Sequence, residues 1–376
     1  MSKKLIIECA TILLTIICCV QPAIALSNAN LNGEYTMCQY GTDPNSMTTI
    51  SDLTCDGNGS VAYQEIASSW GPPYDSGTGT YSVSSDGSLI LGSGTGIVSA
   101  DGNIFTMVDY DASDNALFLW VGIKKSSGMS NAILNGEYTV CQYGTDPNSM
   151  TTISDLTCDG NGSVAYQEIA SSWGPPYDSG TGTYSVSSDG SLILGSGTGI
   201  VSADGNIFTM VDYDVSDNAL FLWVGIKKSS GMSNASLNGE YTMCQYGTDP
   251  NSMTTISDLT CDGNGSVAYQ EIASSWGPPY DSGTGTYSVS SDGSLILGSG
   301  TGIVSADGNI FTMVDYDVSD NALFLWVGIK KSSGDDNGSD DSSEGDGSDD
   351  DSSACFISTG AFGSKVESHI KPLRDF

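Results

Sequence analysis

The sequence predicts an all-β protein with three tandem domains, each an eight-stranded meander barrel or a two-sheet sandwich, followed by a disordered acidic tail. Three observations support this fold class. One segment occurs three times almost unchanged. Within each copy, Asp-Gly and Asn-Gly turn signals separate short runs of β-forming residues. The chain also contains 47 glycines and 18 tyrosines, which favours short strands joined by tight turns.

The repeat begins with Leu31-Asn32-Gly33-Glu34-Tyr35, and this pentapeptide recurs at Leu134 and at Leu237, each time 103 residues further on. A period of this length is a whole domain rather than a solenoid unit. The first two copies differ at three positions only, namely Asn30/Ile133, Met37/Val140 and Ala112/Val215. The predicted segments are a signal peptide (1–25), three β domains (29–128, 132–231 and 235–334), an acidic low-complexity spacer (335–353) and a C-terminal tail (354–376).

Eight strands are predicted in each copy. In the first copy we expect them at 33–41, 48–55, 60–69, 79–85, 88–92, 95–100, 103–110 and 116–125. The last one is apolar on both faces, so it should be the most buried strand or one that packs against a neighbouring copy. Closure of the meander into a barrel would remove the open edges that invite aggregation. The linkers between copies are short, so we expect the domains to sit as beads with limited freedom.

The start of each copy resembles the opening strand of calycin-type barrels such as lipocalins and avidins. The resemblance is carried by Leu31-x-Gly33-x-Tyr35, then Gly41, a β run and Asp56-Gly57. Those families usually have tryptophan where this chain has Tyr35. The resemblance implies a barrel with a ligand mouth at one end, and it carries over no functional residue.

The charge limits the partners. The chain has 45 acidic and 11 basic residues, a formal net charge of −34. Such a surface repels phosphate backbones and anionic lipids, so we expect no nucleic-acid binding. Lys3 and Lys4, the apolar run 10–20 and Ala23-Ile24-Ala25 form a signal-peptide pattern. We therefore expect a secreted or cell-envelope protein with no transmembrane segment in the mature chain. Glu8 keeps an uncleaved anchor open as an alternative.

The cysteines of the repeats come as one pair per copy. In an exported protein the natural interpretation is an intradomain disulfide between the first two strands, with metal binding as the weaker alternative because no histidine accompanies them. The predicted pairs are Cys38 with Cys55, Cys141 with Cys158, and Cys244 with Cys261.

Cys355 is the odd cysteine of the tail. It lies in Ala354-Cys355-Phe356-Ile357-Ser358-Thr359-Gly360-Ala361-Phe362-Gly363 and is followed by Leu373-Arg374-Asp375-Phe376. This resembles the CFI-box C-terminal family of bacterial exported proteins, from which it departs at Ser358, Gly360 and Phe362. The resemblance implies a bacterial envelope or extracellular protein. Cys355 is accordingly a candidate attachment or processing residue, and an incidental thiol is the alternative.

The repeats are not expected to be enzymes. His369, the only histidine, lies in the tail, so the repeats cannot build a Ser-His-Asp or Cys-His site. Glu34 and Glu65 are the only glutamates of the first copy, and a paired-carboxylate hydrolase is the least favoured reading. No catalytic residue, metal ligand or cofactor is predicted.

The candidate binding residues lie in the segment 69–77, the longest interruption of the strand pattern. Two prolines stiffen it between Trp70 and Tyr74, and rigid aromatic side chains make good contacts at little entropic cost. The plainer alternative, which we favour from sequence, is that Trp70 closes the end of the barrel. The equivalent residues of the other copies are Trp173, Tyr177, Trp276 and Tyr280.

These observations predict an exported, non-catalytic binding or adhesion-type repeat protein whose partner is a glycan, a cell surface or a small apolar ligand. Three weak sites would act multivalently. The alternatives are a structural stalk without a ligand, and a lipocalin-like carrier that holds a small apolar ligand inside the barrel.

Overall fold

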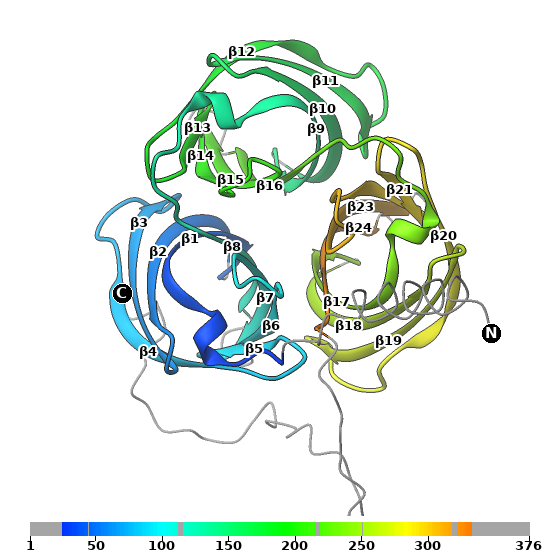
Figure 1. The fold of residues 1–376 in the computed structure, drawn as a ribbon, viewed down its shortest axis with the longest axis horizontal. Helices are drawn as coiled ribbons and strands as arrows, with labels where there is room; N and C mark the ends of the chain where they lie inside the picture. The colour runs from blue at the N-terminus through cyan, green and yellow to red at the C-terminus, as the bar shows by residue number, and fades with distance from the viewer. Residues whose placement is uncertain are drawn as a thin grey trace, which may run out of the picture.

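Three closed β-barrels make up the protein in the computed structural model (Figure 1). The structure describes residues 25–43, 45–111, 116–146, 148–214, 219–249, 251–317 and 322–332. The predicted signal peptide up to residue 24, the acidic spacer, the tail and Cys355 lie outside the described residues. Among the described residues, no helix has the length and apolar character needed to cross a membrane.

Each barrel has eight antiparallel strands in sequence order, so the predicted fold class is confirmed. The first contains β1 (Asn32–Thr42), β2 (Ser46–Asp56), β3 (Ser60–Ser68), β4 (Ser76–Val83), β5 (Ser88–Leu91), β6 (Gly94–Val98), β7 (Ile104–Asp111) and β8 (Ala116–Lys124). The second contains β9 (Asn135–Thr145), β10 (Ser149–Asp159), β11 (Ser163–Ser171), β12 (Ser179–Val186), β13 (Ser191–Leu194), β14 (Gly197–Val201), β15 (Ile207–Asp214) and β16 (Ala219–Lys227). The third contains β17 (Asn238–Thr248), β18 (Ser252–Asp262), β19 (Ser266–Ser274), β20 (Ser282–Val289), β21 (Ser294–Leu297), β22 (Gly300–Val304), β23 (Ile310–Asp317) and β24 (Ala322–Lys330).

The first strand closes each barrel by pairing with both the second and the eighth. In β1, Cys38 is opposite Ile50 of β2 and Val121 of β8. This closure leaves no free sheet edge in a chain whose copies are nearly identical and would otherwise pair edge to edge. The meander is thus a barrel and not the two-sheet sandwich that the sequence left open.

A short 3₁₀ helix precedes the first strand of each copy: η1 (Asn28–Asn30), η2 (Asn131–Ile133) and η3 (Asn234–Ser236). In the first barrel, the Asn28 Oδ1 atom accepts a hydrogen bond of 2.7 Å from the backbone N–H of Val83. The Tyr81 hydroxyl donates to the carbonyl oxygen of Leu31 at 2.6 Å, and the Tyr35 hydroxyl donates to that of Gly102 at 2.7 Å. The bonds of Asn28 and Leu31 fasten the helix across one end of the barrel, which we call the capped end, and the Tyr35 bond ties β1 to the turn before β7 at the same end.

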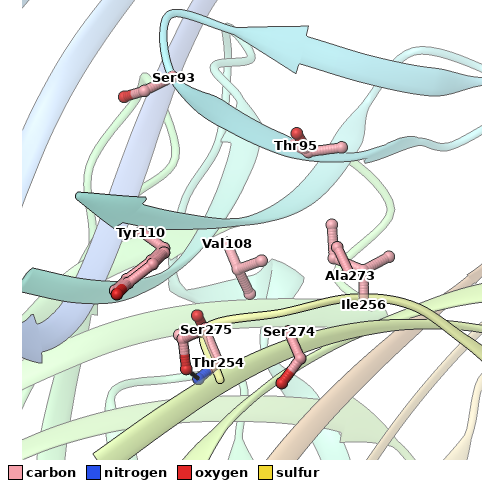
Figure 2. Close-up of a pocket in the computed structure, with 9 residues that line it drawn as sticks. All are labelled: Ser93, Thr95, Val108, Tyr110, Thr254, Ile256, Ala273, Ser274 and Ser275. Atoms are coloured by element: carbon pink, nitrogen blue, oxygen red, sulfur yellow. Dashed lines mark hydrogen bonds between the residues drawn. The ribbon is translucent and has the colours of Figure 1, made fainter. Parts of the chain in front are cut away.

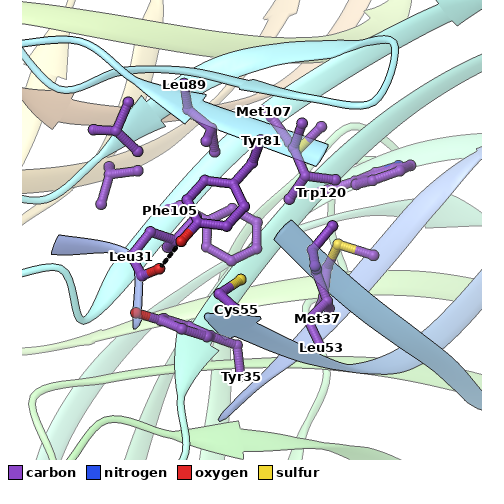
Figure 3. Close-up of a cluster of buried hydrophobic side chains, with 14 of the residues drawn as sticks. Leu31, Tyr35, Met37, Leu53, Cys55, Tyr81, Leu89, Phe105, Met107 and Trp120 are labelled. Atoms are coloured by element: carbon purple, nitrogen blue, oxygen red, sulfur yellow. Dashed lines mark hydrogen bonds between the residues drawn. The ribbon is translucent and has the colours of Figure 1, made fainter. Parts of the chain in front are cut away.

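Packed side chains fill the barrel interior next to the capped end (Figure 3). Leu31, Tyr35, Leu89 and Phe105 are fully buried, and the Tyr35 and Phe105 rings meet edge to face with centroids 5.9 Å apart. The same residues of the second and third barrels form equivalent clusters. The interior is therefore a core of ordinary protein packing, which argues against the ligand-carrier alternative.

The apolar eighth strand serves two cores at once, as its sequence predicts. Phe118 and Trp120 belong to the interior cluster of their own barrel. Leu117 and Leu119 belong to a cluster that all three barrels share. Successive side chains of a strand point to opposite faces of the sheet. One face of β8 thus fills its barrel, and the other packs against a neighbouring copy.

The three barrels form a closed ring around a pseudo-threefold axis (Figure 1). Tyr40, Tyr143 and Tyr246 meet at this axis, and their ring centroids lie 5.2 Å apart in all three pairs. The equivalent valines Val121, Val224 and Val327 form a second layer. Strands β1 and β2 contact β15 and β16, strands β9 and β10 contact β23 and β24, and β17 and β18 contact β7 and β8. The expected string of beads is wrong, because the outer faces of these strands are apolar and bury one another.

The linkers fasten the ring in the same way at each junction. After the first barrel, the backbone N–H of Ser126 donates to the Asp189 carbonyl of the second at 3.1 Å. After the third barrel, which the acidic segment 335–353 follows in the sequence, the backbone N–H of Ser332 donates to the Asp86 carbonyl of the first barrel at 3.0 Å. Lys331 also approaches the Asp86 carboxylate at 3.9 Å. The third copy therefore meets the first through contacts equivalent to those between consecutive copies.

Acid should weaken the barrels through one turn in each copy. The Asp56 carboxylate accepts backbone N–H groups of Asn58 and Ser60 at 2.7 and 2.9 Å, and these bonds hold its pKa below the usual value. A folded-state pKa below the unfolded one adds stability that is complete above the unfolded pKa and is lost as the pH falls through the folded one. The unfolding temperature should therefore drop as the pH is lowered from about 5 to about 2.

The control for this prediction replaces the same turn aspartate in all three copies. Its members are Asp56→Asn, Asp159→Asn and Asp262→Asn. The aspartates of the other two copies make the same bonds and their pKa values are likewise lowered. The variant should show a flatter dependence of unfolding temperature on pH, measured by circular dichroism. An acid dependence as steep as that of the unmodified chain would contradict the role given to these turns.

Candidate functional site: aromatic loops and the seams between barrels

The predicted aromatic segment forms the loop between β3 and β4. Both strands meet this loop at the end of the barrel opposite the capped end. Trp70 is 52% exposed and Tyr74 is 42% exposed, so the expectation that Trp70 closes the barrel is wrong. The loops of the other copies are equally open, with Trp173 and Trp276 both 54% exposed. Because the barrels are related by the pseudo-threefold axis, the three loops lie on one face of the ring.

Hydrogen bonds hold both ends of the loop. Ser69 donates its backbone N–H to the Thr48 carbonyl at 2.9 Å, and its Oγ accepts the Thr48 N–H at 3.1 Å. At the other end, the Glu65 carboxylate accepts the backbone N–H of Asp75 at 3.1 Å. Gly71 has a φ of +73° with open space around its Cα, which suits the tight turn after Trp70. The aromatic side chains therefore project from a loop with fixed ends.

The carboxylates at the loop end of the barrel take part in hydrogen bonds that stabilise the fold. The Tyr63 hydroxyl donates to the Asp75 carboxylate at 3.1 Å, and burial together with this neighbouring charge raises the pKa of Tyr63 to about 12. The Glu65 carboxylate is hydrogen-bonded to the loop, whereas Glu34 of β1 lies opposite Thr54 of β2 near the capped end. The two glutamates of a copy are thus at opposite ends of the barrel. Within the described residues, no group of histidine, cysteine, aspartate and glutamate side chains could hold a metal ion.

The charges of the described residues are distributed unequally between the two faces of the ring. The six lysines lie at or directly after the last residue of the eighth strands, at the capped ends. The face that carries the aromatic loops has carboxylates such as Glu65 and Asp75 but no lysine or arginine within the described residues. This face therefore repels anionic ligands and accepts neutral or basic ones.

Beside each aromatic loop lies a seam between two barrels. At the seam of the third and first barrels there is a small cavity of about 20 Å³ (Figure 2). Six of its nine lining residues carry a hydroxyl group, and the other three are apolar. The first barrel contributes Ser93, Thr95, Val108 and Tyr110, and the third contributes Thr254, Ile256, Ala273, Ser274 and Ser275.

These seam residues were not predicted from the sequence. Thr106, Val108 and Tyr110 alternate with the inward-facing Phe105 and Met107 on β7. An outward apolar Val108 was a signal for packing against a second copy, but nothing local indicates which strand it meets. The seam combines residues of two copies and exists only in the assembled ring.

The predicted disulfides are wrong. All six cysteines of the described residues are buried free thiols. Cys38 is opposite Ile50, five residues from Cys55 along β2, or roughly 17 Å at about 3.4 Å per residue, whereas bridged cysteines have Cα atoms within about 7 Å. Cys55 also belongs to the barrel interior, and Cys38 to the shared cluster between barrels.

The barrel thiols should be unreactive until the protein unfolds. Burial raises the pKa of Cys38 and Cys55 to about 12, so the nucleophilic thiolate is scarce at neutral pH. Alkylation with iodoacetamide at pH 8, followed by peptide mass spectrometry, should leave both residues unmodified in the native chain. Both should be alkylated in denaturant without a reducing agent. Recovery of a peptide pair that joins Cys38 to Cys55 would show that the two residues form a disulfide and would contradict the prediction.

No protein-family model matches the chain, and no curated protein matches its sequence. Similar solved structures include a transferrin-binding protein B variant from Haemophilus parasuis, at 9% identity and a TM-score of 0.28 over 83% of this chain and 76% of that one. The isotype 1 transferrin-binding protein B of serogroup B Neisseria meningitidis has 6% identity and a TM-score of 0.26 over 82% and 77%. Kievitone hydratase from Nectria haematococca has 9% identity and a TM-score of 0.18 over 82% and 93%. These likenesses are distant, and none bears on function.

Proposed function

We propose that the protein is an exported, non-catalytic binding module that holds a glycan through three equivalent aromatic loops. The observation that carries the proposal is the exposure of Trp70 and Tyr74, and of their counterparts, on one face of the ring. Exposed aromatic side chains on a loop with fixed ends offer apolar contact area at little entropic cost. Export is inferred from the signal-peptide pattern of residues 1–25.

The charge of this face selects the kind of glycan. Carboxylates without a nearby cation disfavour uronic-acid, sulfated or phosphorylated polymers. A neutral polysaccharide offers hydroxyl groups to the polar seam and apolar ring faces to the tryptophans. With three loops on one rigid ring, weak single sites would combine into tight attachment to a polymer or a cell wall.

The test is binding of the full chain to insoluble neutral polysaccharides such as chitin and cellulose. The variant with Trp70→Ala, Trp173→Ala and Trp276→Ala should lose at least about 100-fold in apparent affinity, in line with avidity gains of 10² to 10⁴ for linked sites. A matched control carries Ile90→Ala, Ile193→Ala and Ile296→Ala, which are equally exposed residues of β5, β13 and β21, and it should bind normally. If the unmodified chain binds no polysaccharide, the stalk alternative takes precedence.

A further inference from the structure

The seam cavity beside each aromatic loop suggests which sugar the loop recognises. We propose that each binding site is shared by two barrels and takes an N-acetylated hexosamine, with the sugar ring on the loop tryptophan and the acetyl methyl group in the seam. This inference rests on the proposed function and gives it a substrate class. It assigns one seam to each loop, so the ring carries three sites.

The loop and the cavity are contiguous in the chain. Trp276 directly follows the cavity residues Ser274 and Ser275, and its backbone N–H is 3.3 Å from the Ser274 Oγ. Ser275 is tied to Thr254 by bonds of 3.0 and 3.2 Å, which fixes the wall of the cavity. The opposite wall comes from the first barrel, with Tyr110 as its largest side chain (Figure 2).

The lining suits an acetamido group better than a plain hydroxyl. Val108, Ile256 and Ala273 supply apolar surface, and the remaining six lining residues supply hydroxyl groups. A cavity of about 20 Å³ holds little more than one water molecule or one methyl group. An acetamide places a methyl group in apolar surroundings and offers one N–H and one C=O to the hydroxyls around it. A sugar with only hydroxyl groups would leave the apolar part of the cavity unfilled.

The ring makes three such sites, each from two different copies. At the seam of the third and first barrels, Tyr110 lines the same cavity as Ser274 and Ser275 of the loop. The strand contacts repeat at the other two seams, because β2 contacts β15 and β10 contacts β23 as β18 contacts β7. By this equivalence we assign Tyr213 to the loop of the first barrel and Tyr316 to the loop of the second. All three tyrosines are partly buried against the cluster that the barrels share. A single barrel would carry a loop that belongs to one site and a tyrosine that belongs to another, and so no complete site.

The test counts bound sugars on the full chain, with the trimer of N-acetylglucosamine as probe and native mass spectrometry at saturating concentration. The unmodified chain should bind three trimers. Two double variants change the same residue types. Tyr110→Ala with Trp276→Ala damages one seam twice and should leave two trimers bound, whereas Tyr110→Ala with Trp70→Ala damages two seams and should leave one. Equal counts for the two variants would overturn the shared site.

Single variants separate this inference from the proposed function. If Trp276→Ala still binds three trimers, the loop is not the site and the proposed function fails. If Trp276→Ala binds two and Tyr110→Ala binds three, the loop binds sugar without the seam, and only the inference fails.

The trimer of glucose, which lacks the acetyl group, should bind at least about tenfold more weakly, a difference of about 1.4 kcal/mol. Equal affinity for the two trimers would contradict the proposal that the seam cavity binds the acetyl group. Tyr110→Phe, which keeps the ring and removes the hydroxyl, should still bind three trimers. Tyr110→Ala should still bind two trimers at the two unchanged seams, and this retention shows that its loss of one site does not come from unfolding.

Discussion

Replacing Tyr40, Tyr143 and Tyr246 together with alanine should open the ring of barrels. Each of the three side chains is only 1% exposed, and each ring packs edge to face on the other two. Truncation of a fully buried aromatic residue costs about 3–5 kcal/mol, so the three changes remove on the order of 10 kcal/mol from the contacts along the axis. The barrels themselves should persist, because these side chains lie outside the barrel interiors.

Two measurements check this result. Small-angle scattering should show a larger radius of gyration, while far-ultraviolet circular dichroism should remain that of a β protein. The triple isoleucine variant of β5, β13 and β21 is again the control, since substitutions of exposed residues away from special features usually stay within about 0.5 kcal/mol. An unchanged radius of gyration in the tyrosine variant would show that the three tyrosines do not hold the ring together.

Gly199→Ala should strongly destabilise the middle barrel. Gly199 lies opposite Met210 in the pairing of β14 with β15. A Cβ at this position would lie 2.0 Å from the Thr209 carbonyl oxygen and 2.5 Å from the Met210 Cα. These are backbone atoms, so relief would require the two strands to move apart. We expect a loss of about 3 kcal/mol, at the upper end of the usual cost of overpacking.

The control is another strand glycine of the same barrel. At Gly182 of β12, an added Cβ would meet only Val164 Cγ1, at an ordinary distance of 3.5 Å. Gly182→Ala should therefore leave the stability unchanged or raise it by about 0.5 kcal/mol, because alanine restricts the unfolded chain. Denaturant unfolding of the full chain measures both variants. Equal midpoints for the two would contradict the close approach of β14 and β15.

Most strands could be predicted because turn-forming residues mark their ends. The segment 33–41 was predicted and Asn32–Thr42 is observed, since Gly33 and the sequence Asp43-Pro44-Asn45 delimit it locally. The segment 79–85 was less accurate, because β4 begins at Ser76. Ser76, Gly77 and Thr78 show no marked β preference and become strand only by pairing with β3. Propensity alone does not reveal pairing that a neighbouring strand imposes.

Of the candidate site, the aromatic loop was predicted from the sequence and the seam was not. Pro72 and Pro73 interrupt the strand pattern and so placed Trp70 and Tyr74 on a loop. Whether those rings close the barrel or face solvent depends on what already fills the interior, and Tyr35, Phe105 and their neighbours fill it. Tyr110 could not be predicted as a partner of the loop, because the two belong to different copies.

The sequence by itself determined what is local: the repeat of 103 residues, the turns that order eight strands into a meander, and the acidity that disfavours anionic partners. Only the tertiary structure decided how the copies relate to one another. The faces of Cys38 and Cys55 follow from strand register, and the meeting of Tyr40 with Tyr143 and Tyr246 follows from contacts between residues more than 100 positions apart. Local propensity and turn chemistry act within a few residues, whereas the closed ring arises because three apolar outer faces have no other surface on which to be buried.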